Sequence, residues 1–233
     1  MELGGNAPFV VCEDADMDTA VAAAMAAKMR NMGEACTSAN RILVHRSVLD
    51  EFGRRLTEKM SALTVGDGTT EGTDVGPLVE EKAVTKVVDL VDDAVERGAE
   101  VLTGGSRLDG PGYFYPPTVL TGVTPDAELM STEIFGPVAA LVPFDTDDEA
   151  VTLANDTEFG LVSYVMTENL DRAMTMSERL QAGMVGINVG VVSNPAAPFG
   201  GIKQSGLGRE GGLEGIEEYL YTQYIGIADP YAG

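Results

Sequence analysis

The sequence predicts an α/β fold built on an open, largely parallel sheet with helices on both faces, which makes three layers. Short apolar segments rich in β-branched residues, each of the length of one strand, recur at 41–45, 100–103, 117–121, 138–143, 161–166 and 184–189. Segments with helical periodicity lie between them. This alternation is typical of a parallel sheet, in which functional groups are expected at the carboxyl ends of the strands.

Five segments are expected to be helices, at 16–32, 47–63, 79–98, 147–154 and 169–182. The first begins with cap-forming aspartates, continues with Ala and Met at helical spacing and stops at Gly33. The second begins with Ser47 as a cap and carries one apolar face. The third has a stripe of valines and ends at Gly98. Beyond them, the aromatic-rich segment 216–227 is expected to be a strand that pairs with another chain.

The charge of the chain argues against nucleic acid as a partner. Acidic residues number 37 and basic residues 15, for a net charge of −22. A field of this sign repels a polyanion, so nucleic acid is not expected as a partner. We interpret acidic runs such as 145–149 as solvated surface rather than metal ligands. The excess is spread along the chain, as expected for a protein kept soluble at the high salt of a halophile, where self-repulsion is screened.

The sequence also carries no sign of membrane insertion or export. No apolar stretch is long enough to cross a bilayer, and the first residues lack the basic and apolar regions of a secretory signal. We therefore expect a cytoplasmic protein that has no membrane partner.

Two cysteines and one histidine limit the chemistry that the chain can perform. Cys12 and Cys36 are too few for a disulfide framework and lack the spacing of a zinc site. His45 ends a strand-like segment, which favours a surface position over catalysis. Hydrolysis that depends on a histidine is therefore disfavoured, and one of the two thiols is the better candidate for a reactive group.

Cys36 lies in the turn between the first helix and the strand at 41–45, where a side chain can point into a cleft. At a reference pKa of roughly 8.5, only about 3% of a thiol is thiolate at neutral pH. A nucleophilic Cys36 therefore needs a base, and Glu2 is a candidate. The alternative, a small buried hydrophobic residue, stays open on these grounds alone.

Several segments concentrate glycine and reactive groups, and together with the segment at 133–137 they resemble the signatures of the aldehyde dehydrogenase family. The matching motifs are Glu2-Leu3-Gly4-Gly5, Gly33-Glu34-Ala35-Cys36, Glu133-Ile134-Phe135-Gly136-Pro137, Pro198-Phe199-Gly200-Gly201 and Ser205-Gly206-Leu207-Gly208-Arg209-Glu210. They occur in that family's order and at about its spacing, and the likeness covers essentially the whole chain.

The resemblance implies a covalent mechanism and a nicotinamide cofactor. Cys36 would be the nucleophile that attacks the aldehyde, and Glu2 the general base that activates water to hydrolyse the resulting thioester. Glu133 would bind the nicotinamide ribose hydroxyls, while Phe135 and Phe199 would wall the pocket. The residues that choose between NAD and NADP belong to the amino-terminal half of the family, so either cofactor is compatible with this chain.

Two further residues suggest the class of aldehyde. Arg30 and Ser193 match the carboxylate-binding positions of succinate-semialdehyde dehydrogenases, and a guanidinium suits a carboxylate. Arg30 could equally be a cation that stabilises the end of a helix. Ser38 stands where some of those enzymes carry a second cysteine, so a disulfide switch with Cys36 is not expected.

The resemblance further divides the chain into a catalytic domain, 1–204, and a carboxyl-terminal arm with an oligomerisation strand, 205–233. The family's amino-terminal dinucleotide-binding domain, with its cofactor-binding lysine and oxyanion-binding asparagine, has no counterpart in these residues. We expect a homo-oligomer formed through the arm, or a partner chain that supplies the other domain. The alternative functions are a catalytically silent remnant or interaction module, and a cofactor-free esterase that uses Cys36 and Glu2.

Overall fold

A computed structural model describes residues 1–228 and shows a seven-stranded sheet with the order β3-β4-β5-β2-β1-β7-β8. Its strands are β1 (Ala7–Val11), β2 (Ala39–His45), β3 (Glu100–Thr103), β4 (Thr118–Thr121), β5 (Val138–Phe144), β7 (Val162–Met166) and β8 (Met184–Ile187). All neighbours run parallel except β3, which pairs antiparallel with β4 at one edge. The predicted open, largely parallel sheet is therefore confirmed.

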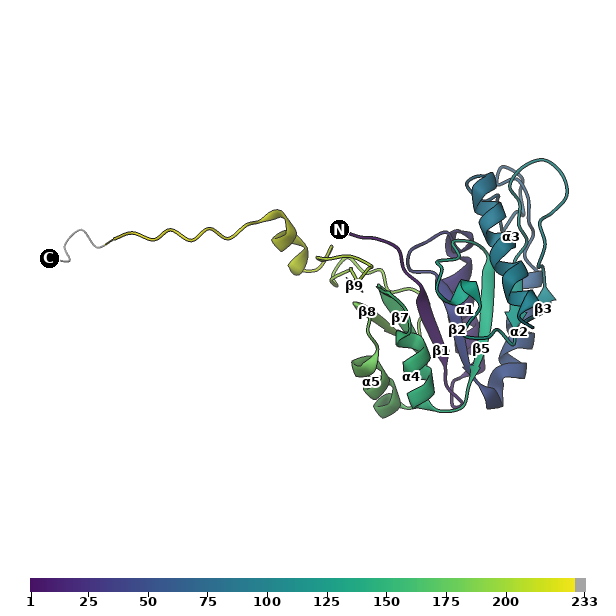
Figure 1. The fold of residues 1–233 in the computed structure, drawn as a ribbon, viewed down its shortest axis with the longest axis horizontal. Helices are drawn as coiled ribbons and strands as arrows, with labels where there is room; N and C mark the ends of the chain where they lie inside the picture. The colour runs from purple at the N-terminus through teal and green to yellow at the C-terminus, as the bar shows by residue number, and fades with distance from the viewer. Residues whose placement is uncertain (229–233) are drawn as a thin grey trace.

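Helices cover both faces of this sheet (Figure 1). They are α1 (Met17–Met29), α2 (Leu49–Ser61), α3 (Glu81–Glu96), α4 (Asp147–Asn155) and α5 (Leu170–Arg179). One buried cluster joins α1 and α2 to alternate strand residues such as Phe9 and Ile42, and a second joins α3, α4 and α5 to the intervening ones such as Val10 and Leu43. The pleat sends successive side chains to opposite faces, so each central strand contributes to both cores. Of residues 1–228, no helix combines the length and the apolar character needed to cross a membrane.

The helix ends differ from the predicted ones where local backbone geometry takes over. Asp16 caps α1 as expected, and its carboxylate accepts from the Thr19 N–H at 2.8 Å. The helix nevertheless stops at Met29 instead of residue 32, because Asn31 and Met32 adopt left-handed conformations with φ of 50° and 56°. Ser47 does not cap α2, since it lies in a 3-10 turn, Arg46–Val48, that precedes the helix.

Two strand pairings were not predicted from the sequence. β1 lies between β2 and β7 and is buried on both faces, as are these two predicted neighbours. Its segment differs from theirs in carrying Pro8, which is disfavoured in a central strand, but the pairing of β1 with β2 shifts register between Ala7 and Pro8, where a missing N–H is tolerated. The second is a small antiparallel pair, β6 (Phe159–Gly160) with β9 (Ile202–Lys203).

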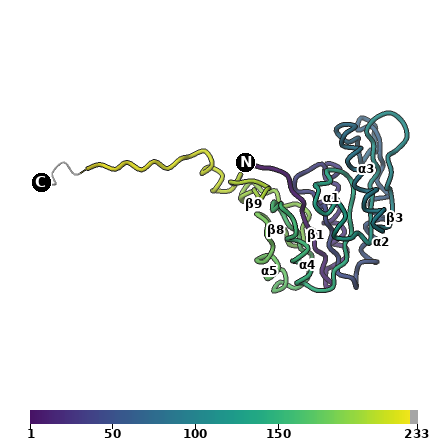
Figure 2. The backbone as a smooth tube through the Cα atoms, in the orientation of Figure 1, coloured from purple at the N-terminus to yellow at the C-terminus, as the bar shows by residue number. Residues whose placement is uncertain are grey.

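The carboxyl-terminal segment extends away from the body of the molecule (Figures 1 and 2). Residues Glu214–Tyr219 form a 3-10 helix, so the strand predicted to begin at 216 is wrong in its first part. From 220 to 228 the chain has no ladder partner in the described structure, although its large apolar side chains, Tyr221 and Tyr224 among them, are exposed. Residues 229–233 of the predicted arm lie outside the described residues, and pairing with another chain stays a prediction.

Arg41 is a charged residue in the centre of the sheet, and it secures α4. Its side chain is fully buried, and its guanidinium donates to the Leu153 and Ala154 carbonyls at 2.8 Å each and to the Asn6 carbonyl at 3.0 Å. Burial lowers the pKa of Arg41 to about 10. The last carbonyls of a helix have no partner within the helix, so Arg41 satisfies groups that would otherwise be buried unpaired.

Replacing Arg41 should therefore be costly. We expect Arg41→Met to lower the free energy of unfolding by about 3 kcal/mol, because it leaves buried carbonyls without donors. Urea denaturation followed by circular dichroism measures this. The control is Arg46→Met, which removes an exposed ion pair with Asp145 and should leave the midpoint nearly unchanged. Equal losses in the two variants would contradict this role for Arg41.

Candidate active site

The residues predicted to carry chemistry meet at the amino ends of three neighbouring strands. Glu2–Gly5 precedes β1, Cys36 precedes β2 and Glu133–Gly136 precedes β5, and these strands are adjacent and parallel in the order β5-β2-β1. The expectation of a site at the carboxyl ends is therefore wrong. At that edge Arg172 binds Glu13, Asp14 and Asp147 at 2.8 to 3.0 Å.

Cys36 is held in a tight turn immediately before β2. The Ser38 N–H donates to the Ala35 carbonyl at 2.9 Å, which closes the turn around Cys36 and Thr37. Gly33, with φ of 80°, leads into this turn, and a β-carbon added there would collide with the Gly136 carbonyl. The approach to the nucleophile is therefore packed directly against the Glu133–Gly136 segment.

The thiol of Cys36 is half-buried and lies in a negative field. Burial, then the Glu2 carboxylate, then that of Glu133 raise its pKa, while the backbone N–H groups of Cys36 and Thr37 lower it by a smaller amount. The pKa of this thiol therefore lies above that of an ordinary cysteine, and its proton must leave before the sulfur can attack an electrophile. Cys12, by contrast, is buried against Met176, and burial raises its pKa to about 12. Cys36 is thus the only plausible nucleophile of the two thiols.

Glu2 is placed by a backbone contact with the carboxyl-terminal motif. Glu2 forms an isolated antiparallel β-bridge with Gly206, and the Leu3 N–H donates to the Ser205 carbonyl at 3.0 Å. Burial and the charge of Glu210 raise the pKa of Glu2, and the chain's terminal amine opposes them. A carboxylate with a raised pKa accepts a proton more readily, which suits a general base. Glu210 had no predicted role, although it lies in a motif that the sequence had singled out.

Glu133 and Phe135 form the third part of the site. The half-buried carboxylate of Glu133 accepts from the Gly5 N–H at 3.1 Å, and burial raises its pKa, against the opposing effects of Gly5, Lys86 and Lys28. Lys86 donates to the Glu133 carbonyl at 3.3 Å and lies 5.7 Å from the centroid of the Phe135 ring. The carboxylate keeps acceptor positions for hydroxyl donors, so these residues fit a ribose.

Gly5 joins the base, nucleophile and cofactor segments. Besides its bond to Glu133, it lies so close to Cys36 that an added β-carbon would collide with the Cys36 carbonyl oxygen. Only glycine allows this approach of two backbones. The sequence had marked this residue as part of a motif without giving it a contact.

Gly5→Ala should therefore disturb the nucleophile. We expect a loss of about 1–3 kcal/mol in unfolding free energy, since backbone must move to admit the methyl group, together with altered alkylation of Cys36 by iodoacetamide. Urea denaturation and mass spectrometry of the alkylated peptide measure the two effects. Gly68→Ala is the matched control, because a β-carbon there meets no atom within 4 Å. If both variants match the wild type in stability and in alkylation, the close approach of Gly5 to the Cys36 carbonyl does not require glycine.

The predicted substrate-binding residues are only partly brought together. Phe199 is half-buried and exchanges two backbone hydrogen bonds with Glu210, at 2.7 Å each, which places it beside the Glu2 region. Arg30 lies at the end of α1, exposed, and donates to the Thr37 hydroxyl at 3.2 Å. Ser193 lies on an exposed loop, and the described residues show no hydrogen bond between it and Arg30. A shared carboxylate site stays a prediction.

Lys28 is a buried cation behind the site that had no predicted role. Its ammonium group donates to the Asn40 side chain at 3.0 Å and to the Gly136 carbonyl at 3.3 Å, and burial lowers its pKa to about 7. It thereby ties α1 and β2 to the Glu133–Gly136 segment. The signal was present in the helical spacing, which puts Lys28 on the same buried stripe as Ala20 and Ala24.

The depressed pKa of Lys28 predicts a pH-dependent contribution to stability. Between pH 7 and 10.5 the unfolded chain binds the proton more tightly than the folded one, so stability should rise with pH across that window. We expect the free energy of unfolding of the wild type, relative to that of Lys28→Met, to increase by at most about 1.4 kcal/mol per pH unit from pH 7 to 9. Urea titrations of both proteins at pH 6, 7, 8 and 9 measure this difference. A constant difference between the two proteins would show that Lys28 does not titrate there.

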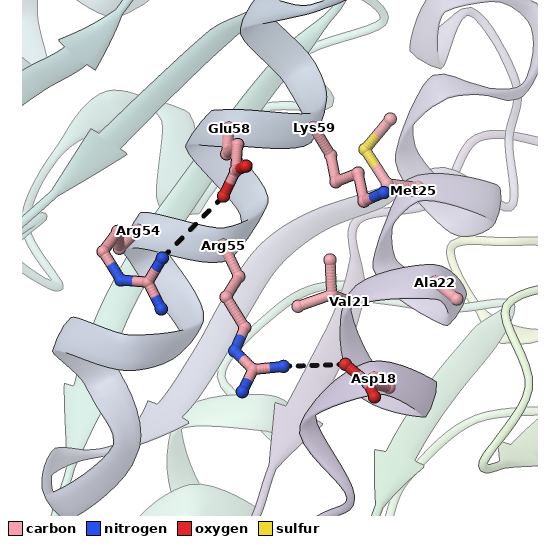
Figure 3. Close-up of a pocket in the computed structure, with 8 residues that line it drawn as sticks. All are labelled: Asp18, Val21, Ala22, Met25, Arg54, Arg55, Glu58 and Lys59. Atoms are coloured by element: carbon pink, nitrogen blue, oxygen red, sulfur yellow. Dashed lines mark hydrogen bonds and ion pairs between the residues drawn. The ribbon is translucent and has the colours of Figure 1, made fainter.

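A wide groove between α1 and α2, with a volume of about 780 Å³, lies on another part of the surface (Figure 3). Its lining residues are Asp18, Val21, Ala22, Met25, Arg54, Arg55, Glu58 and Lys59. Arg55 is paired with Asp18 at 2.7 Å, and Arg54 lies 3.8 Å from Glu58. No predicted site residue lines this groove, so the amino edge of the sheet is the better candidate for the site.

Known proteins share both this fold and this sequence. The model of the aldehyde dehydrogenase family matches residues 1–225. A succinate-semialdehyde dehydrogenase of Paenarthrobacter nicotinovorans is 58% identical over 231 residues, which are 99% of this chain and 51% of that protein. An NADP(+) succinate-semialdehyde dehydrogenase of Escherichia coli K12 is 48% identical over 97% of this chain and 47% of its own length.

A solved aldehyde dehydrogenase structure from Brucella melitensis biovar abortus 2308 superposes with a TM-score of 0.93 at 55% identity, over 96% of this chain and 46% of that one. Fold and comparisons thus define an α/β domain built on a mostly parallel sheet. The chain belongs to the aldehyde dehydrogenase family. It spans about half the length of the curated relatives that it matches.

Proposed function

We propose that this chain is the thiol-bearing half of an NAD(P)-dependent aldehyde dehydrogenase, which converts an aldehyde to its acid through a thioester on Cys36. The observation that carries the proposal is the convergence of Cys36, Gly5 and Glu133 at the amino ends of β2, β1 and β5. Nucleophile, base segment and cofactor segment come from distant parts of the chain, yet they share one small region.

The first step is addition of the thiolate to the aldehyde. The thiol proton leaves to solvent, so Glu2 stays ionised and free to act as the base in the later hydrolysis. The sulfur then bonds to the carbonyl carbon, and the oxygen becomes an oxyanion. The Cys36 N–H, held in the tight turn, is placed to donate to that oxygen.

The second step needs a hydride acceptor. A bound nicotinamide would supply that acceptor, and loss of hydride from the carbon would leave a thioester on Cys36. Glu133 would hold the ribose hydroxyls and Phe135 would wall the ring site. Glu2 then removes a proton from water, the water oxygen attacks the thioester carbon, and the acid leaves with the thiol restored. The raised pKa of Glu2 favours this role.

The substrate that we propose carries a carboxylate, as succinate semialdehyde does. Arg30 supports this because its guanidinium reaches the residue next to the nucleophile, Thr37, at 3.2 Å. Two of the relatives are named for that same aldehyde. The choice between NAD and NADP stays open. A cytoplasmic location and a homo-oligomer formed through the arm, residues 205–233, remain part of the proposal, as does a partner domain that completes the cofactor site.

The test joins this chain to the amino-terminal half of the Paenarthrobacter relative and also assays the chain alone. With succinate semialdehyde and NAD or NADP, we expect cofactor reduction by the joined form only. Cys36→Ala should abolish it. Glu2→Gln should slow turnover by about 10²–10⁴-fold and accumulate a thioester on Cys36, seen as a mass increase of the intact protein.

Cys12→Ala is the matched control and should retain turnover, because Cys12 is buried outside the site. Activity that survives in Cys36→Ala would overturn the proposal. Ester hydrolysis by the chain alone, unaffected by nicotinamide nucleotides, would support the esterase instead. Absence of every activity in the joined form would favour the silent interaction module.

A further inference from the structure

Tyr164 in β7 is a buried hydroxyl that the proposed mechanism does not use. Its side chain is 1% exposed, and its ring packs on Phe9 with centroids 5.8 Å apart. Its neighbours in the strand, such as Val162 and Met166, are apolar, so packing alone would be served by phenylalanine. A phenol in such a place is costly unless its hydroxyl is bonded. The bond that it makes therefore identifies its role.

That bond reaches the residue next to the nucleophile. The Tyr164 hydroxyl donates to the Thr37 carbonyl at 2.9 Å in the interior of the protein. The other polar group of the same peptide unit, the Ser38 N–H, donates to the Ala35 carbonyl and closes the turn. This peptide is thus held at both ends, from inside the turn and from β7.

Thr37 is restrained a third time through its side chain, whose hydroxyl accepts from Arg30 at 3.2 Å. With carbonyl and hydroxyl both held, the residue cannot rotate about its backbone without breaking one of these bonds. The backbone N–H groups of Cys36 and Thr37 lie in the same turn and favour the thiolate form of Cys36. Their direction therefore depends on the restraint that Tyr164 supplies.

We propose that Tyr164 is a positioning residue for the nucleophile: by holding the Thr37 carbonyl, it keeps the turn that carries Cys36 in a single conformation. This inference rests on the proposed function in one respect, that Cys36 is the reactive thiol. Tyr164 touches neither sulfur nor substrate. It suits this task because burial raises the pKa of its phenol to about 12, so it stays a donor across the range in which a thiol titrates.

The test follows the alkylation of Cys36 by iodoacetamide in this chain from pH 7 to 10.5, with the Cys36 peptide quantified by mass spectrometry. No cofactor or catalytic turnover is needed. In Tyr164→Phe we expect the midpoint of the pH profile to move to higher pH, with about threefold to tenfold less thiolate at a given pH, the effect of one lost hydrogen bond. The rate at the high-pH plateau should be preserved.

Tyr115→Phe is the matched control. Tyr115 is as buried as Tyr164 but belongs to the cluster on the opposite face of the sheet, so its profile should follow the wild type. Circular dichroism verifies that each variant is folded at the assay temperature. Cys36→Ala sets the background, which should be low because Cys12 is buried.

Three outcomes would overturn the inference. The first is a pH profile of Tyr164→Phe that coincides with that of the wild type. The second is a lowered alkylation rate at the plateau with an unchanged midpoint, which indicates altered access to the thiol. The third is an equal shift of the midpoint in Tyr115→Phe, which indicates a general effect on the core. None of them bears on the proposed function, whose failure appears instead as the absence of a Cys36 thioester in the joined form of Glu2→Gln.

Discussion

The close approach of the Gly5 backbone to the Cys36 carbonyl is the contact on which the rest of the site depends. It is possible because β1 and β2 are adjacent and parallel, so that the segments entering them arrive side by side. The same backbone donates to the Glu133 carboxylate before β5. Three segments distant in sequence thus become one site through strand order, and the burial of those strands on both faces holds them in register.

Carboxylates and lysines around the site have opposing effects on the pKa values of its groups. Two carboxylates, of Glu2 and Glu133, oppose ionisation of the thiol, while two lysines, Lys28 and Lys86, support the charged form of Glu133. Glu210 in turn raises the pKa of Glu2. Burial and these charges therefore raise the pKa of both the Cys36 thiol and the Glu2 carboxyl above their ordinary values.

Much of the fold could be predicted from the sequence because the helices are amphipathic and the strands are short apolar runs between them. β5 and α4 lie where the pattern puts them. β1 was not predicted, although it is as apolar as its neighbours, and its segment carries Pro8, a residue that central strands disfavour. The end of α1 was misplaced because Asn31 and Met32 adopt left-handed conformations that residue type alone does not announce.

The site was less accessible to sequence reasoning. Glu133 could be singled out only through a family motif, since Gly5 and Glu133 are 128 residues apart and no periodicity connects them. Cys36 and Glu2 were candidates by residue type, and the motifs gave them their proposed roles. The general rule for parallel sheets pointed to the carboxyl edge, whereas the candidate residues lie at the amino edge. The burial of Lys28 could have been predicted, since helical spacing puts it on the same buried stripe of α1 as Ala20 and Ala24.

The negative field around Cys36 has a consequence for the chemical durability of the protein. Oxidants such as peroxide attack thiolates far more readily than thiols. Burial and the charges of Glu2 and Glu133 raise the pKa of the Cys36 thiol, which lowers the fraction of thiolate that an oxidant meets. Ser38 and the burial of Cys12 leave Cys36 without a neighbouring thiol for a disulfide, so a sulfenic acid formed there would need a thiol from outside the chain.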